Sequence, residues 1–159
     1  MPILLYRVDE RLIHGQVVVG WGSRLHPDRY LVVDDELASA VWEQELYELS
    51  VPGGVEVEFV EVTGARERLE EWRDAGADSV LLTRTVEAML ELARGGGLRG
   101  EEVNLGGIHH EPGRTKTLSY IYLDEEDRAR LRELEEEDVT VVARDLPGST
   151  AVELERLLS

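Results

Sequence analysis

The sequence contains no cysteine among its 159 residues. Disulfide bonds, thiolate nucleophiles and cysteine-based zinc sites are therefore excluded. The chain also lacks any run of about 18 apolar residues, the length that a membrane-spanning helix requires. Its first residues, MPILLYRVDERL, have neither the basic stretch nor the long apolar core of a secretion signal. We therefore expect a cytoplasmic protein.

Positive charge is scarce as well. Lysine and arginine together number 17 against 34 aspartates and glutamates, which gives a formal net charge of -17, and Lys116 is the only lysine. Binding to nucleic acid or to an anionic membrane depends on Lys and Arg side chains that displace the counterions of phosphates. A surface with this excess of negative charge repels both, so we expect no nucleic-acid partner.

Apolar residues are abundant, at 42% of the chain. This length and composition fit a single domain, residues 1–159, with one core. Strands are predicted at Ile3 to Val8, Tyr30 to Val33, Val55 to Val62, Ser79 to Thr83, Val103 to Leu105, Leu118 to Leu123 and Val139 to Ala143. Helices are predicted at Glu36 to Leu49, Ala65 to Ala75, Val86 to Ala93 and Asp124 to Asp138, and a last helix follows Pro147-Gly148-Ser149 and ends at Leu157-Leu158. Such alternation implies an α/β fold, a mostly parallel sheet of about six to seven strands with helices on both faces.

The functional site of such a fold lies at the carboxyl ends of the strands. The loop after the first predicted strand is rich in polar residues and contains His14. An imidazole has a pKa of about 6.5, so much of it is neutral and nucleophilic at cellular pH. Gly15 and Gln16 are expected to begin a helix, and the exposed N–H groups and positive dipole of a helix start suit an anion. The loop therefore combines a nucleophile with an anion site.

Charged side chains lie close to this histidine in the sequence. Arg11 offers a planar guanidinium that grips phosphate oxygens, and Arg7 adds a second positive charge. Asp9 is suited to orient an imidazole nitrogen or to tether an arginine. If His14 attacked phosphorus, it would form a reactive phosphoramidate whose charge these donors would stabilise. The residues alone also suit an ordinary loop histidine beside arginines paired with Asp9 and Glu10, so both interpretations stay open.

The segment RVDERLIHGQVVVGW, residues 7–21, resembles the R-[IV]-D-x-R-L-[IL]-H-G-Q-V signature of one family of IIB proteins. These are the IIB subunits of the mannose/fructose/sorbose family of the phosphoenolpyruvate-dependent sugar phosphotransferase system. Residues 32–38 (VVDDELA), 51–55 (VPGGV) and 103–109 (VNLGGIH) extend the likeness along nearly the whole chain, whereas residues 145–150 match less closely. The resemblance implies a three-layer α/β/α fold and allows one antiparallel edge strand.

This resemblance implies a phosphotransferase that works through a phosphohistidine. His14 would accept a phosphoryl group from a phosphohistidine of a IIA partner and pass it to a sugar held by the membrane IIC and IID components. Arg11, Gly15, Gln16 and Arg7 would bind the phosphate. No metal or other cofactor is implied, because the donor is already reactive, and the protein would act in the cytoplasm, transiently at the inner face of the membrane.

The sequence leaves several functional questions open. The sugar is not specified, and neither is the formation of a homo-oligomer. A regulatory phosphocarrier without sugar transport remains an alternative, as does a non-catalytic module that binds small anions.

Residues that follow other predicted strands are candidate supporting residues, together with Asp9. Asp34 either faces the pocket at a strand end or caps a helix. Arg84 would add a cation after its strand. Gly106 and Gly107 either cradle phosphate or form a plain turn.

Paired histidines and three tryptophans complete the candidates. His109 and His110 are adjacent, and neighbouring side chains usually diverge, so without further ligands at suitable spacing we expect no metal site. At least one of them is expected to line the rim of the site. Trp21, Trp42 and Trp72 are expected to pack in or against the core.

Overall fold

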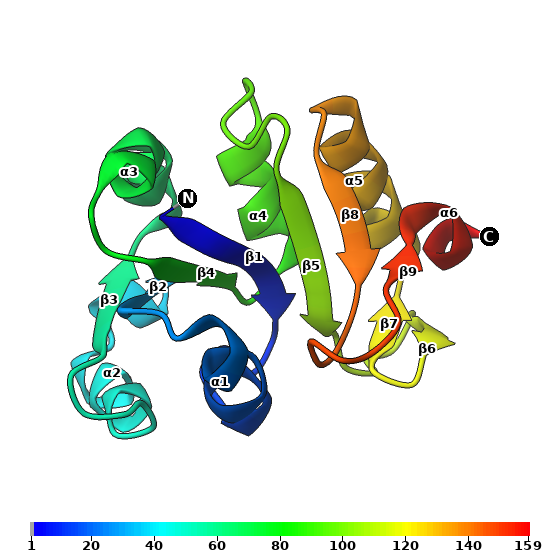
Figure 1. Cartoon of the computed structure of the whole chain (residues 1–159). Coiled ribbons are helices and arrows are strands. Elements are labelled where there is room, and N and C mark those ends of the chain that lie inside the picture. Colours follow the sequence, from blue (N-terminus) through cyan, green and yellow to red (C-terminus); the bar gives the residue numbers. More distant parts are fainter. Residues whose placement is uncertain (1) are drawn as a thin grey trace.

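The computed structural model describes residues 2–159, and its centre is a seven-stranded sheet (Figure 1). The strand order is β3-β2-β4-β1-β5-β8-β9, and the pairings are parallel except for the edge pair β8 and β9. These strands are β1 (Ile3–Asp9), β2 (Arg29–Val33), β3 (Glu56–Val60), β4 (Ser79–Thr83), β5 (Glu102–Gly107), β8 (Thr140–Ala143) and β9 (Val152–Glu153). The predicted three-layer fold with one antiparallel edge strand is confirmed.

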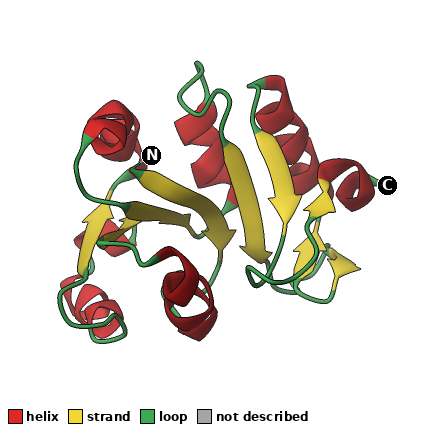
Figure 2. Ribbon diagram, viewed as in Figure 1, coloured by secondary structure: helices red, strands yellow, loops and turns green. Residues whose placement is uncertain are grey.

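Helices lie on both sides of this sheet (Figure 2). They are the π-helical η1 (Gln16–Trp21), which continues into α1 (Gly22–Leu25), the 3-10 turn η2 (Leu37–Ser39), α2 (Val41–Glu48), α3 (Val62–Asp74), α4 (Val86–Ala93), α5 (Glu125–Glu136) and α6 (Leu154–Leu158). Within residues 2–159, none of them is long and apolar enough to cross a membrane.

Strand β1 separates two apolar clusters because successive side chains point to opposite faces of a sheet. Tyr6 and Val8 belong to the cluster beneath α3, α4 and α5, whereas Leu5 belongs to the cluster beneath η1. Arg7 and Asp9 share the face of Leu5 by the same alternation, and both are fully buried. The sheet thus places two charged side chains beneath the helix that follows His14.

The predicted strand Leu118 to Leu123 is wrong as a single element. Its residues form parts of an antiparallel hairpin, β6 (Thr115–Leu118) and β7 (Ile121–Leu123), outside the main sheet. Leu118 pairs with Ile121 across the turn. The apolar residues of the two arms are therefore close in the sequence and have the pattern of a single strand.

The predicted helix Glu36 to Leu49 is interrupted at Ala40. Ala40 has φ -106° and ψ 78°, which ends η2 and starts α2 in a new direction. Three apolar residues of this segment are exposed to solvent, with Val41 65%, Leu46 52% and Leu49 82% exposed. The spacing of apolar residues along the predicted helix therefore does not reveal which side of α2 packs.

Three smaller boundaries also differ from the prediction. Strand β3 ends at Val60, and α3 begins at Val62 because the Asp35 carboxylate accepts the Val62 N–H at 2.8 Å. The segment after Ser149 first forms the edge strand β9 and only then the short α6.

Trp21 and Trp72 are buried as expected, but Trp42 is 67% exposed on α2, so its predicted packing is wrong.

Candidate functional site

The candidate site lies where β1 ends, between β4 and β5. Asp9 ends β1 and lies in register with Gly107 at the end of β5. Leu12 then adopts a left-handed conformation, with φ 56°, and donates its N–H to the Asp9 carbonyl at 2.9 Å. Leu12 is fully buried in this tight turn. The turn keeps the following residues close to the carboxyl ends of the strands. His14 is thereby placed beside Asp9.

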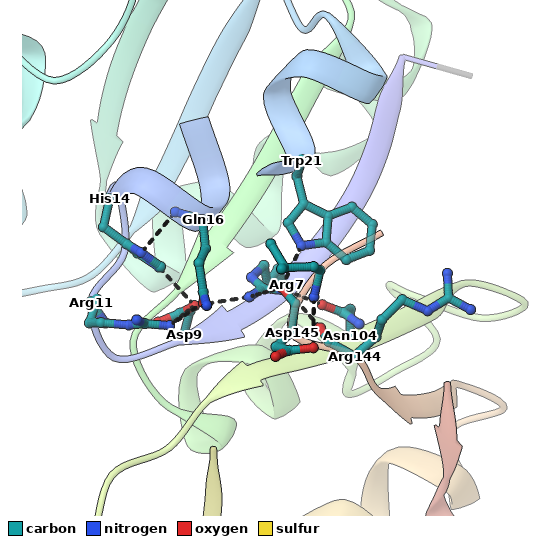
Figure 3. Close-up of polar contacts among 10 residues, drawn as sticks. Arg7, Asp9, Arg11, His14, Gln16, Trp21, Asn104, Arg144 and Asp145 are labelled. Atoms are coloured by element: carbon teal, nitrogen blue, oxygen red, sulfur yellow. Dashed lines mark hydrogen bonds and ion pairs between the residues drawn. The ribbon is translucent and has the colours of Figure 1, made fainter. Parts of the chain in front are cut away.

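The imidazole of His14 is held at both nitrogens (Figure 3). Its Nε2 lies 3.0 Å from Asp9 Oδ2, and the Gln16 N–H points at Nδ1 over 3.4 Å. An ionised carboxylate only accepts hydrogen bonds, so Nε2 carries the proton and Nδ1 keeps its lone pair. The side chain is 17% exposed, which leaves the ring accessible to a docking partner.

Asp9 is the centre of this arrangement. Burial by itself would raise the pKa of its carboxyl, but the hydrogen bond from His14 and the charge of Arg7 outweigh burial and lower the pKa to about 2. Its oxygens also accept from the Arg11 N–H at 3.0 Å and from Arg11 Nε at 3.3 Å. Asp9 is therefore a carboxylate at every pH at which a histidine titrates.

Arg11 lies on the solvent side of Asp9. Its side chain is 37% exposed, and its Nη2 donates to Gln16 Oε1 at 2.8 Å. The guanidinium is thus oriented by Asp9 and Gln16 while part of it faces outward (Figure 3). We expect this exposed part of the guanidinium to bind phosphate.

Arg7 occupies a different position from the one expected. Its side chain is fully buried, and its Nη atoms donate to Asp9 Oδ2, to Asn104 Oδ1 and to the carbonyls of Arg144 and Asp145. Burial lowers the pKa of this guanidinium, and the Asp9 charge opposes that shift. Since its terminal N–H groups already have acceptors away from solvent, we expect Arg7 to position Asp9 and not to contact phosphate.

Residues far along the chain complete the surroundings of Arg7. The ring of Trp21 lies 5.4 Å from the Arg7 guanidinium carbon, and its Nε1 donates to the Asp145 carbonyl at 2.9 Å. Asn104 is 2% exposed on β5. Sequence reasoning assigned no role to Asn104 or to the backbone of Arg144 and Asp145. One signal was available, because Asn104 is the polar residue in the apolar run Val103 to Leu105.

Gly106 and Gly107 do not form the turn that was one of the two alternatives. Both belong to β5, and they leave room for side chains of the site. A Cβ on Gly106 would overlap the Arg7 guanidinium, and one on Gly107 would lie 2.9 Å from Asp9 Oδ1. The plain turn is therefore wrong, both glycines meet a packing requirement of the site, and phosphate binding by them stays a prediction.

Gly106→Ala is expected to lower the free energy of unfolding by about 1–3 kcal/mol, because the new methyl group would overlap the Arg7 guanidinium. Urea denaturation of both proteins measures the difference. Gly15→Ala is the matched control, since Gly15 has a right-handed helical conformation and nothing lies within 4 Å of its Cβ position. If Gly106→Ala were as stable as Gly15→Ala, the proposed packing of Arg7 on Gly106 would be wrong.

Asp34 and Arg84 meet at the ends of the neighbouring strands β2 and β4. Asp34 Oδ2 accepts the Leu37 N–H at 3.0 Å, and its Oδ1 lies 3.4 Å from Arg84 Nε. Asp34 thus caps η2 and also holds Arg84. Arg84 also lines a small cavity of about 80 Å³ together with Glu10 and Arg114. Arg84 therefore lies beside the loop that follows β1, to which Glu10 belongs.

His109 and His110 diverge, as expected for adjacent residues. His109 Nδ1 lies 3.1 Å from Glu10 Oε2, and its side chain is 55% exposed. The ring of His110 makes an edge contact with Tyr122, with the centroids 5.6 Å apart. His109 therefore lies on the rim beside the His14 loop, whereas His110 packs against β7.

Comparison with known proteins places this geometry in a family. The family model "PTS system sorbose subfamily IIB component" matches residues 3–159. The N-acetylgalactosamine-specific phosphotransferase enzyme IIB component 1 of Escherichia coli K12 is 31% identical over 148 residues, 92% of each chain. The mannose-specific EIIAB component of the same strain is 29% identical over the whole of this chain, which spans 49% of that protein.

A solved structure agrees with the sequence matches. The crystal structure of the IIBSor domain of the sorbose permease from Klebsiella pneumoniae superposes with a TM-score of 0.86 at 26% identity, covering 99% of this chain and 96% of that one. The fold and the sequence thus identify the same group of proteins. This chain belongs to the sorbose subfamily of the IIB components of the sugar phosphotransferase system.

Proposed function

We propose that this protein is a phosphocarrier that accepts a phosphoryl group on Nδ1 of His14 and passes it on to a sugar during uptake. The observation that carries the proposal is the fixed imidazole: Asp9 holds Nε2, and Nδ1 faces the Gln16 amide. A nucleophile whose second nitrogen is fixed by a buried carboxylate is oriented for attack, and only the long 3.4 Å hydrogen bond from the Gln16 N–H must leave Nδ1 first. Membership of the IIB family supports this reaction class.

The transfer needs no base at the acceptor nitrogen. The Nδ1 lone pair of neutral His14 forms the new N–P bond, while the donor's P–N bond breaks and its electron pair stays on the donor nitrogen. The product ring carries the phosphoryl group on Nδ1 and a proton on Nε2, so it is cationic. The Asp9 carboxylate, 3.0 Å from Nε2, stabilises this charge.

The second transfer uses the same groups in reverse. Because Nε2 keeps its proton, the N–P bond breaks with neutral imidazole as the leaving group and not an imidazolate. The phosphorus forms its new bond to a sugar hydroxyl oxygen, whose proton passes to a base or water of the acceptor complex. Asp9 therefore serves both half-reactions by keeping one tautomer.

The phosphoryl oxygens need donors during both steps. Arg11 presents an exposed guanidinium that Gln16 orients at 2.8 Å, and the Gly15 and Gln16 amides lie at the start of η1. Gly15 has open space where a side chain would begin, so an approaching donor meets no obstruction there. We assign phosphate binding to Arg11 and to these two amides.

The partners follow from the chemistry of donor and acceptor. A IIA protein carrying a phosphohistidine is the proposed donor, and one relative of this chain is itself named an EIIAB component. The proposed acceptor is a sugar held by membrane IIC and IID components, which this protein would visit from the cytoplasm. Both partners must reach the partly exposed His14 ring. The two complexes therefore form in turn and not together.

A labelling experiment tests the proposal. The protein is incubated with radiolabelled phosphoenolpyruvate, the general phosphotransferase proteins and a IIA protein of this family. An acid-labile, base-stable label on His14 that then moves to sugar in membranes containing IIC and IID is the expected result. A label that never moves to sugar would favour the regulatory alternative. Phosphate binding without covalent label would favour the anion-binding module.

Arg11→Lys is expected to slow labelling about 10-fold and Arg11→Gln about 100-fold, because lysine keeps the charge but loses the planar pair of donors. Rapid-quench measurement of the labelling rate checks this. Arg99→Lys is the matched control. Arg99 is 71% exposed, pairs with Asp138 and precedes β5, so it lies at the amino ends of the strands and away from His14. Equal rates for Arg11→Gln and wild type would remove Arg11 from the phosphate site.

A further inference from the structure

Asn104 lies beside Arg7 in the sheet. The two residues are paired in the register of β1 and β5, and so they share one face of the sheet. Asn104 is 2% exposed, and its Oδ1 accepts a hydrogen bond from Arg7 Nη1. Its strand neighbours Val103 and Leu105 face the opposite apolar cluster. A buried amide at this position thus serves the charged group and not the core.

The Arg7 guanidinium is enclosed by acceptors from three parts of the chain. Asn104 supplies a side-chain oxygen, and the carbonyls of Arg144 and Asp145 lie 2.9 Å from Nη1 and 3.0 Å from Nη2. The second donor of Nη2 reaches Asp9 Oδ2 at 3.2 Å. Figure 3 shows Asn104 on the side of Arg7 away from His14.

This enclosure determines where the guanidinium lies. Arg7 Nε is buried without a hydrogen-bond partner, so all side-chain hydrogen bonds of the guanidinium are made by its Nη atoms. Removing Asn104 Oδ1 leaves a buried charged donor unpaired, which is costly, so the guanidinium is expected to turn toward another acceptor. Any such turn changes the contact with Asp9, the group that fixes the His14 tautomer.

We propose that Asn104 is a positioning residue for phosphoryl transfer, acting through Arg7 and Asp9 on His14. This inference rests on the proposed function of His14 as the phosphoryl acceptor. It adds a residue 90 positions away from the histidine, on another strand, to the set that determines its reactivity. Small errors in position near a reacting group reduce rates by up to about 100-fold.

The test compares Asn104→Ala with Asn104→Asp. Asn104→Ala removes the acceptor oxygen and is expected to lower the maximal labelling rate of His14 about 10-fold or more, with the KM for the phospho-IIA donor unchanged. Asn104→Asp keeps an acceptor of the same shape and is expected to restore most of that rate. Ser79→Ala is the matched control, because Ser79 is a buried side chain that accepts from Arg29 Nε at 2.7 Å, at the amino ends of β2 and β4.

A second readout does not depend on phosphorylation. Nitrogen-15 NMR of the His14 ring is expected to show the Nε2–H tautomer in wild type and in Ser79→Ala, and a mixture of tautomers in Asn104→Ala. If Asn104→Ala matches Ser79→Ala in both labelling rate and ring signals, Asn104 is merely structural and the inference is wrong. If wild type is never labelled, the proposed function fails while the ring signals still decide the positioning by Asn104.

Discussion

Replacing His14 by alanine is expected to abolish phosphoryl acceptance. The proposed acceptor atom is Nδ1 of this ring, and the variant has no nucleophile at that position. The imidazole is partly exposed and makes its side-chain contacts with Asp9 and the Gln16 amide, so the fold is expected to survive the change. Incubation with the phosphoenolpyruvate-dependent donors and counting of protein-bound label measure the effect, and we expect no label above background.

His109→Ala is the matched control for this experiment. His109 lies on the same rim, is 55% exposed and pairs with Glu10 at 3.1 Å and not with Asp9. Its loss is expected to leave the labelling rate within about twofold of wild type, since a surface substitution away from the reacting atoms costs little. If His14→Ala were still labelled at the normal rate, or if His109→Ala lost the label, the assignment of the acceptor would be overturned.

Asp9→Asn is expected to slow labelling of His14 by about 10²–10⁴-fold, in line with the loss that follows when a carboxylate that orients a catalytic histidine is made neutral. An asparagine amide that donates to Nε2 would move the ring proton to Nδ1, the atom that must attack. The variant also loses the negative charge that stabilises the phosphorylated ring, at 3.0 Å from Nε2. Rapid-quench labelling at saturating donor measures the rate.

A loss of folding must be separated from this chemical effect. Asp9 also faces the buried Arg7, and removal of the carboxylate leaves that charge less well paired. Rates are therefore expressed per folded molecule, as measured by circular dichroism. Glu10→Gln is the neighbouring control, because Glu10 pairs with Arg114 at 2.8 Å and with His109. Labelling of Asp9→Asn at the rate of Glu10→Gln would show that Asp9 does not set the tautomer.

The prediction for Asp9→Asn depends on the ionised state of Asp9. Hydrogen bonding from His14 and the charge of Arg7 overcome the effect of burial and hold its pKa at about 2. The carboxylate is therefore present well below the pH range in which an imidazole loses its proton. Any pH dependence of labelling near neutrality should thus come from groups other than Asp9, and Asp9→Asn should change the rate at every pH in that range.

Much of the architecture could be predicted from local sequence. Buried parallel strands are continuous apolar runs, which is why the strand Ser79 to Thr83 is predicted correctly. The helix that begins after Asp124 is also predictable, because a capping box is a local arrangement, and both of its hydrogen bonds are formed with Asp127. Features such as these depend only on interactions between residues that are close together in the sequence.

The errors have a common cause, which is that they depend on contacts with other elements. Leu46 and Leu49 have helical spacing, but the helix begins only after the break at Ala40 and both side chains are exposed. Apolar residues on both arms of β6 and β7 looked like one strand, because pattern alone does not reveal a turn without glycine or proline. Tertiary packing determined these cases.

The sequence by itself determined the proposed reacting group and its immediate contacts. Asp9, Arg11, His14 and Gln16 lie within eight consecutive residues, so one loop conformation suffices to bring them together. The resemblance of that segment to the IIB family is likewise a property of the sequence alone. The hydrogen bonds between these residues span two to five positions in the chain.

Only the tertiary structure decided what Arg7 and Gly106 do. Arg7 bonds to Asn104 and to the Asp145 carbonyl, 97 and 138 positions away, and those partners come together only when β5 and β8 take their places in the parallel sheet. The same register puts the Arg7 guanidinium where a Gly106 side chain would begin. Arg7, which the resemblance assigns to phosphate binding, is therefore fully buried in contact with Asp9 and Asn104, because the pairing of strands, and not distance along the chain, sets which groups meet.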